Sequence, residues 1–169
     1  MKPWLRLTLI TATVGGGFTG IAVTFQALLD PRNQSPLLLM GFFLALFTYV
    51  TVSGLIFVQN PERKRPLIAA LAIQIPWISS PFVVYEFAAG CRAVLSLRMP
   101  EQVGLPIDTY IPLGSGWRFF LLQSNPWSIG INIFPLVILV SLLRSIRAPH
   151  SVVSLTASSP SQNDPALIS

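Results

Sequence analysis

The chain has 169 residues, of which 52% are hydrophobic and only 10% are charged. Soluble globular domains carry about 25% charged residues, so this composition excludes an ordinary soluble fold and indicates a lipid bilayer as the solvent. The formal net charge of +5 does not indicate nucleic acid binding, because the cations do not gather on an aromatic-rich soluble surface.

Four apolar segments along the chain are each long enough to be read as a membrane helix, which needs about 20 residues. We therefore predict an all-α integral membrane protein, a four-transmembrane-helix bundle in a single membrane domain over residues 1–148. An outer segment over residues 90–126 separates the last two spans, and residues 149–169 are predicted to form a disordered cytoplasmic tail. The predicted spans cover residues 7–29, 36–58, 67–89 and 127–146.

The basic stretch Arg63-Lys64-Arg65 between the second and third segments orients the chain. Lysine and arginine in short loops are retained on the cytoplasmic side of a membrane. With this loop inside, seven cations lie inside and four lie outside, and both termini are cytoplasmic. We expect a bacterial cytoplasmic (inner) membrane location.

The first segment follows Lys2 and Arg6 and continues to Leu29 without a small-x-small cleavage signal, so we predict an uncleaved span. Gly16 and Gly20 lie on one face of this helix and form a small-xxx-small pair, which permits close helix packing. The face is either a seam for a partner or a contact with another span of the same chain.

The third segment contains Pro76 and Pro81, each of which removes a backbone donor and kinks a helix. We predict a broken or strongly bent third helix, whose freed carbonyl groups are satisfied by nearby polar side chains. Together with a polar residue of the fourth segment, these side chains form a candidate polar intramembrane site. Its members are Gln74, Ser79, Ser80, Glu86 and Asn132.

Glu86 is the only carboxylate inside or at the edge of any predicted span, and an intramembrane ionisable residue is by default a functional-site hypothesis. Glu86 is expected near the outer interface, however, where an ion pair with Arg92 or Arg118 is the simpler interpretation. Asn132 is predicted to form a hydrogen bond with the broken part of the third span or with Glu86.

Apolar and polar residues alternate in the outer segment between Val103 and Leu113 and again from Trp117 to Leu122. This period of two predicts an extracytoplasmic β-hairpin that turns at Gly114-Ser115-Gly116. Before it, residues 91–99 are predicted to form a short interfacial helix.

Cys91 is the single cysteine and His150 the single histidine. This excludes an intramolecular disulfide, a Cys-x-x-Cys pair and a paired-histidine haem site, and it disfavours a metal cluster or an intramembrane Ser-His dyad. We predict no catalytic, cofactor-binding or metal-binding residues and no cofactor.

Three functions remain open. The favoured hypothesis is a non-enzymatic accessory, assembly or immunity-type protein whose partners are the lipid bilayer and another membrane protein. The alternative is a small oligomeric transporter or channel, in which the broken third span and Glu86 line a path. A lipid-modifying enzyme using Glu86, Asp108 and Arg118 is the third and least supported.

Overall fold

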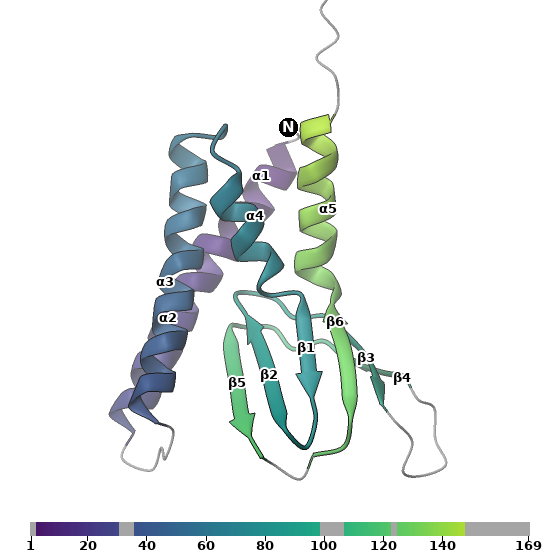
Figure 1. The fold of residues 1–169 in the computed structure, drawn as a ribbon. Coiled ribbons are helices and arrows are strands. Elements are labelled where there is room, and N and C mark those ends of the chain that lie inside the picture. The colour runs from purple at the N-terminus through teal and green to yellow at the C-terminus, as the bar shows by residue number, and fades with distance from the viewer. Residues whose placement is uncertain (1–2, 31–35, 99–106, 123–124, 148–169) are drawn as a thin grey trace, which may run out of the picture.

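The computed structural model describes residues 3–30, 36–98, 107–122 and 125–147. It overturns the predicted four-helix bundle, because a six-stranded antiparallel sheet lies where the third span, the outer segment and the start of the fourth span were expected. The fold is therefore α+β. Helical segments gather at one end of the molecule, and α2 and α3 continue along one side of the sheet (Figure 1). The predicted disordered tail, residues 149–169, lies outside the described residues.

The first predicted span is one continuous helical rod made of α1 (Pro3–Ile10), the π-helical segment η1 (Thr11–Gly15) and α2 (Gly16–Leu29). In η1 the Gly16 N–H donates to Thr11 O, five residues back, so the segment holds one extra residue per turn. The second predicted span is α3 (Leu37–Gln59). Both helices, 27 and 23 residues long, are long and apolar enough to cross a membrane.

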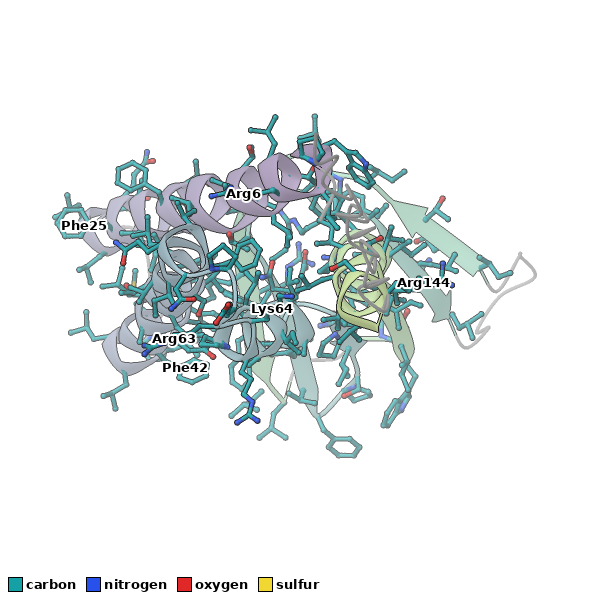
Figure 2. All side chains as sticks on the ribbon, turned by 90° about the horizontal axis from the view of Figure 1, so that it is seen from above. Arg6, Phe25, Phe42, Arg63, Lys64 and Arg144 are labelled. Carbon is teal, nitrogen blue, oxygen red and sulfur yellow. The ribbon has the colours of Figure 1, made fainter. Side chains whose placement is uncertain are left out.

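The start of α1, the connection from α3 to α4 (Arg65–Ala72) and the end of α5 (Ile133–Arg147) lie at one end of the molecule (Figure 1). Seen from that end, Arg6, Arg63, Lys64 and Arg144 surround the helix ends, whereas Phe25 and Phe42 project from the outer sides of α2 and α3 (Figure 2). We call this the basic end of the molecule.

The prediction of a third membrane helix was wrong. Helix α4 (Arg65–Ala72) has only eight residues, and the chain then forms β1 (Pro76–Ser79) and β2 (Val83–Ala88). Proline disfavours helical geometry in the residue before it, so Pro76 ends the helix instead of kinking it. The residues that follow are rich in aromatic and β-branched types, which pack well on a pleated surface.

The fourth predicted span is also not a membrane helix along its whole length. It begins as β6 (Ser128–Asn132) and becomes helical only in α5 (Ile133–Arg147). A 15-residue helix is about 22 Å long, which is less than the roughly 30 Å of a hydrocarbon core.

The six strands lie in the order β4-β3-β6-β1-β2-β5. This order contradicts the predicted hairpin, because β4 (Ile107–Tyr110) and β5 (Gly116–Leu121) are strands at opposite edges of the sheet and do not pair. The predicted interfacial helix over residues 91–99 is also wrong, since β3 (Val94–Arg98) lies there. Residues 99–106, which include the start of the predicted hairpin, lie outside the described residues.

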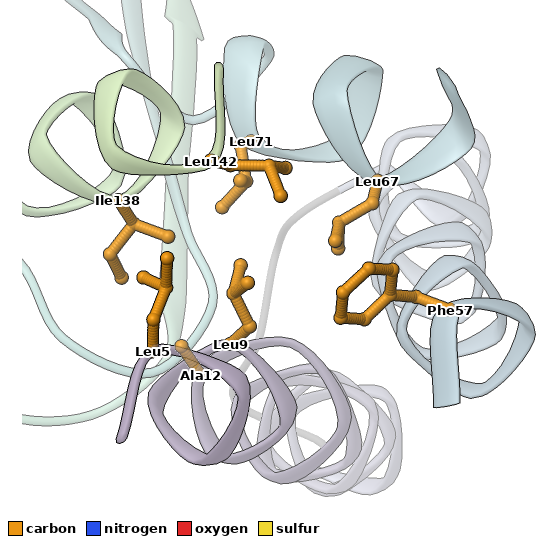
Figure 3. Packing of buried hydrophobic residues seen from close by; sticks show 8 residues of the cluster. All are labelled: Leu5, Leu9, Ala12, Phe57, Leu67, Leu71, Ile138 and Leu142. Carbon is orange, nitrogen blue, oxygen red and sulfur yellow. The ribbon is translucent and has the colours of Figure 1, made fainter. Parts of the chain in front are cut away.

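Two buried clusters hold the helices to each other and to the sheet. One joins α3 to the sheet through aromatic rings: Phe43 stacks on Trp117 with ring centroids 4.4 Å apart, and Phe47 lies 4.8 Å from Phe87. The other lies beneath the basic end, where side chains of α1, α3, α4 and α5 and of the first η1 turn converge (Figure 3). Its members are Leu5, Leu9, Ala12, Phe57, Leu67, Leu71, Ile138 and Leu142.

Candidate functional site

The structure brings together three of the five residues of the predicted polar site. Gln74, Glu86 and Asn132 surround the end of the sheet that faces the helices, together with Arg92. Ser79 and Ser80 lie at the opposite end of β1. Ser79 there pairs with Ser128 of β6, and Ser80 closes the β1–β2 turn by accepting from Val83 N–H, with its Oγ and the Val83 nitrogen 3.0 Å apart.

Gln74 and Asn132 hold the connection between β2 and β3, residues 89–93, which crosses two intervening strands. The Gln74 side chain accepts from Ala89 N–H at 2.8 Å and donates to Ala70 O at 2.8 Å. Asn132 accepts from Ala93 N–H at 2.9 Å. Both amides are buried, and their carbonyl oxygens are occupied by backbone donors of the connection. Their role in this structure is to position that connection.

Glu86 lies between two arginines. Its carboxylate pairs with the guanidinium of Arg92 through Oε1, and Arg118 Nε lies 3.8 Å from Oε2. The predicted ion pair is therefore confirmed with both candidates. Glu86 is 7% exposed and Arg92 18%, whereas Arg118 is 61% exposed, so the pair with Arg92 is the desolvated one. Arg92 Nε is buried without a hydrogen-bond partner among the described residues.

This polar cluster has no room for a ligand. Among its side chains there is no space for a water-sized molecule. The neighbouring Tyr85 hydroxyl donates to Ile73 O at 3.0 Å. Within the described ranges, no group of three or more histidine, cysteine or carboxylate side chains could hold a metal ion. The arrangement is that of a structural brace.

Gly16 and Gly20 both pack against other segments of this same chain. A Cβ added at Gly16 would lie 2.4 Å from Gly90 N, and one at Gly20 would lie 2.1 Å from the Phe47 ring. The sequence identified this small-residue face but could not identify its two neighbours, the β2–β3 connection and α3.

Ser115 connects the same segments by hydrogen bonds, and no sequence pattern predicted this role. Its Oγ donates to Gly16 O, accepts from Gly90 N–H at 2.8 Å and lies 2.7 Å from Thr19 Oγ1. A serine between two glycines in a predicted turn does not reveal a contact 99 residues away in the chain.

An open groove lies along the first helical rod, beside this crossing point. It has a volume of about 620 Å³ and runs from Leu7 to Thr19 on the helix. Gly90, Cys91, Leu113 and Phe134 form its other wall. This volume falls within the roughly 300–1,000 Å³ of ligand pockets, and of the sites considered it has the most room.

Comparison with known protein families, with curated proteins and with solved structures finds no match to this chain.

The brace can be tested by Gln74→Met, which keeps the size of the side chain but removes the acceptor for Ala89 N–H. Leaving that buried donor unpaired should lower the free energy of unfolding by about 1–3 kcal/mol. The measurement is a denaturant titration of the purified protein in mild detergent, followed by tryptophan fluorescence. Gln59→Met, at an exposed position, should stay within about 0.5 kcal/mol of the parent chain, and equal effects of both variants would contradict the assignment.

Proposed function

We propose that this chain is a non-enzymatic membrane protein that binds a transmembrane helix of another membrane protein on the outer face of its sheet. The observation that supports this proposal is an inverted alternation in the sheet. In β6 both isoleucines are exposed, whereas Ser128, Gly130 and Asn132 are buried. In β3 both leucines are exposed and Ser96 between them is buried, and only the strand ends, buried Val94 and exposed Arg98, depart from this alternation.

The register places the exposed apolar residues on one face, since Leu97 pairs with both Ile129 and Ile107, and Leu95 pairs with Ile131. Their exposed fractions range from 37% for Leu95 to 61% for Leu97. We call these five residues the apolar sheet face. On the opposite face the side chains of Ser96, Ser128 and Asn132 are buried. A sheet in water shows the reverse pattern, with apolar residues inside.

Helix α3 already covers the other half of this face. Ile78 of β1 pairs with Ile129 on one side and with Tyr85 on the other, so the face continues from β6 into β2 and β5. There, Tyr85, Trp117 and Phe119 pack against Phe43 and Phe47 of α3. A second apolar helix on the uncovered half would extend the same packing.

The depth of the sheet supports an occupant from the membrane. The β2–β3 connection touches the first helical rod at Gly16, close to the middle of its 27 residues. When this rod crosses a bilayer, the sheet begins near mid-depth. Backbone that is not helical is tolerated at that depth only where protein covers it or where it lines a cavity.

The edge strand β4 also needs to be covered by protein at that depth. In the strand order β4 is terminal, and no described strand pairs with its outer edge. An open edge in hydrocarbon leaves peptide groups unsatisfied, and each such group costs several kcal/mol. A partner that covers the apolar sheet face and this edge would remove the cost, which supports an accessory protein over a chain that acts alone.

No structural feature now supports the transporter alternative among the described residues. It required a discontinuous third membrane helix with Glu86 lining a path, whereas the described residues place Glu86 on β2 in an ion pair with Arg92. The lipid enzyme required Glu86, Asp108 and Arg118 to converge, but Asp108 lies on β4 and pairs with Arg98 at 3.0 Å.

A paired substitution on the apolar sheet face tests the proposal. Leu97→Thr with Ile129→Thr removes two facing apolar side chains and keeps residues that suit strands. The tagged chain is purified from its native membrane in mild detergent, and co-purifying proteins are identified by mass spectrometry. We expect a stoichiometric membrane protein with the parent chain and about tenfold less of it with the variant.

The matched control is Leu37→Thr with Leu38→Thr, which removes two exposed leucines (73% and 90%) from the far end of α3. This control should retain the partner. A parent chain that purifies alone or as a homo-oligomer contradicts the proposal, and so does equal recovery of the partner by both paired variants.

A further inference from the structure

The groove beside the first helical rod is separate from the apolar sheet face, and its shape arises from missing side chains. Gly15 and Gly16 lie along the helix side of the groove, and Gly90 and Gly114 along the loop side. The two loop glycines have φ of +94° and +118°, a conformation that residues with a Cβ rarely adopt. A Cβ at Gly15 or Gly114 would meet nothing within 4 Å, so the space at these positions is empty.

The π-helical segment η1 lies in the middle of this groove. Thr11, Ala12 and Gly15, three of its five residues, line the groove. A π-segment has poorer hydrogen-bond geometry than an α-helix, and such segments occur frequently at functional sites. In this chain the extra residue of the π-segment lies where the first helical rod faces the groove.

The length of the groove matches half a membrane. From Leu7 to Thr19 the helix rises by about 18 Å at about 1.5 Å per residue. Half of a roughly 30 Å hydrocarbon core is about 15 Å. The groove therefore runs from just below the basic end to about mid-depth, over the thickness occupied by the acyl chains of one leaflet.

The lining offers little for polar recognition. Thr8 Oγ1 donates to Trp4 O at 3.0 Å, and Thr19 Oγ1 is hydrogen-bonded to Gly16 O at 2.9 Å. Leu7, Leu113 and Phe134 supply apolar walls. A hydrocarbon chain needs no hydrogen bonds and fits such a lining.

Trp4 lies at the end of the groove nearest the basic end. It is 58% exposed and precedes Thr8 by one turn, so it shares the helix face that lines the groove. Interfacial tryptophans meet lipid headgroups at this level. Arg6 faces the other way, since its guanidinium donates to Val58 O of α3 at 3.5 Å.

We propose that this groove binds one acyl chain of a membrane phospholipid from the leaflet at the basic end, with its headgroup at the level of Trp4. The lipid fills the space that Gly15 and Gly114 leave open and covers the exposed side of η1. The proposal shares with the proposed function the premise that the first rod crosses a bilayer, but it does not need the partner protein, since the groove and the apolar sheet face share no residue.

Gly15→Leu tests the site, because it fills the groove without a backbone collision and replaces glycine by a better helix former. Gly41→Leu is the matched control. Gly41 also lies in a membrane-length helix, and a Cβ there meets nothing within 4 Å. Purified chains are exchanged into nanodiscs of mixed phosphatidylglycerol and phosphatidylcholine, and the lipid retained after extraction into mild detergent is read by native mass spectrometry.

We expect one phospholipid per chain in the parent protein and in Gly41→Leu, and at least about tenfold less in Gly15→Leu. Circular dichroism should show the same folded content for all three chains. Equal retention in the three chains would overturn the proposal.

Cys91 provides an independent readout, since it lines the groove and is the only cysteine of the chain. Alkylation of Cys91 by N-ethylmaleimide in delipidated protein should slow when phosphatidylglycerol is added, and this effect should vanish in Gly15→Leu. If a bifunctional cross-linker on Cys91 captures a protein helix in native membranes while added lipid gives no protection, the groove belongs to a protein and the lipid assignment falls.

Discussion

Gly16→Ala should strongly destabilise the fold. The new Cβ would lie 2.4 Å from Gly90 N, 2.6 Å from Ala89 C and 2.7 Å from Gly90 Cα. These are backbone atoms, and the connection that carries them is held by Gln74 and Asn132. Overpacking typically costs about 1–3 kcal/mol, and we expect about 3 kcal/mol here because neither side can move aside cheaply.

Gly15→Ala is the control one residue away, where the added Cβ meets nothing within 4 Å. It should be neutral or stabilising by up to about 1 kcal/mol, because alanine is the better helix former. Both free energies of unfolding are measured by denaturant titration in the same detergent. If the two alanine variants differ by less than about 1 kcal/mol, Gly16 does not make the close contact described.

This contact places the sheet along the first rod. The first rod approaches the β2–β3 connection through Gly16 and approaches α3 through Gly20. The sheet is thereby packed against the middle of the rod, and α4 and α5 need to be only as long as the space between the sheet and the basic end. Their 8 and 15 residues fit that role.

Hydropathy predicted the positions of apolar segments but not their secondary structure. The first two segments lack internal proline and are helices α1–α2 and α3. In the third, Pro76 and Pro81 fit both a kinked helix and two strands joined by a turn, and apolar runs of this kind do not distinguish the two by periodicity. The strand-forming residues Val83, Val84 and Tyr85 were the available signal, and the length of the apolar run concealed it.

The strands of the outer segment were visible as alternation, but their pairing was not. Sequence proximity favoured a hairpin between the strands that contain Thr109 and Phe119, whereas the sheet separates β4 from β5 by four other strands. Long-range order of this kind depends on which faces can be covered, and α3 covers β2 and β5 through Phe43 and Phe47. No local pattern in residues 107–122 contains that information.

The candidate site was predicted in part for the same reason. Glu86 and Asn132 stand out because they are polar among apolar neighbours, and the Glu86–Arg92 pair follows from charge alone. The roles of Gln74 and Ser115 depend on backbone groups 15 and 25 residues away, in a connection that no motif marks. The groove was not predicted, since it consists of absent side chains.

Arg92→Met should cost about 3 kcal/mol of unfolding free energy. Glu86 is 7% exposed, and removal of its buried partner leaves a desolvated carboxylate, which typically costs about 3–5 kcal/mol. Arg118 remains 3.8 Å away and offsets part of this loss, so the lower end of the range applies. Methionine retains most of the packing of the arginine stem, so the charge is the main loss.

Two further variants separate charge from packing. Arg118→Met removes an arginine that is 61% exposed, and exposed pairs contribute about 0–1 kcal/mol, so its effect should be small. The double variant Arg92→Met with Glu86→Gln removes the stranded charge and should recover stability relative to Arg92→Met alone, because replacing both ions of a buried pair is far less costly than removing one. If the double variant is no more stable than Arg92→Met alone, Arg92 stabilises the fold through packing and not by neutralising the Glu86 carboxylate.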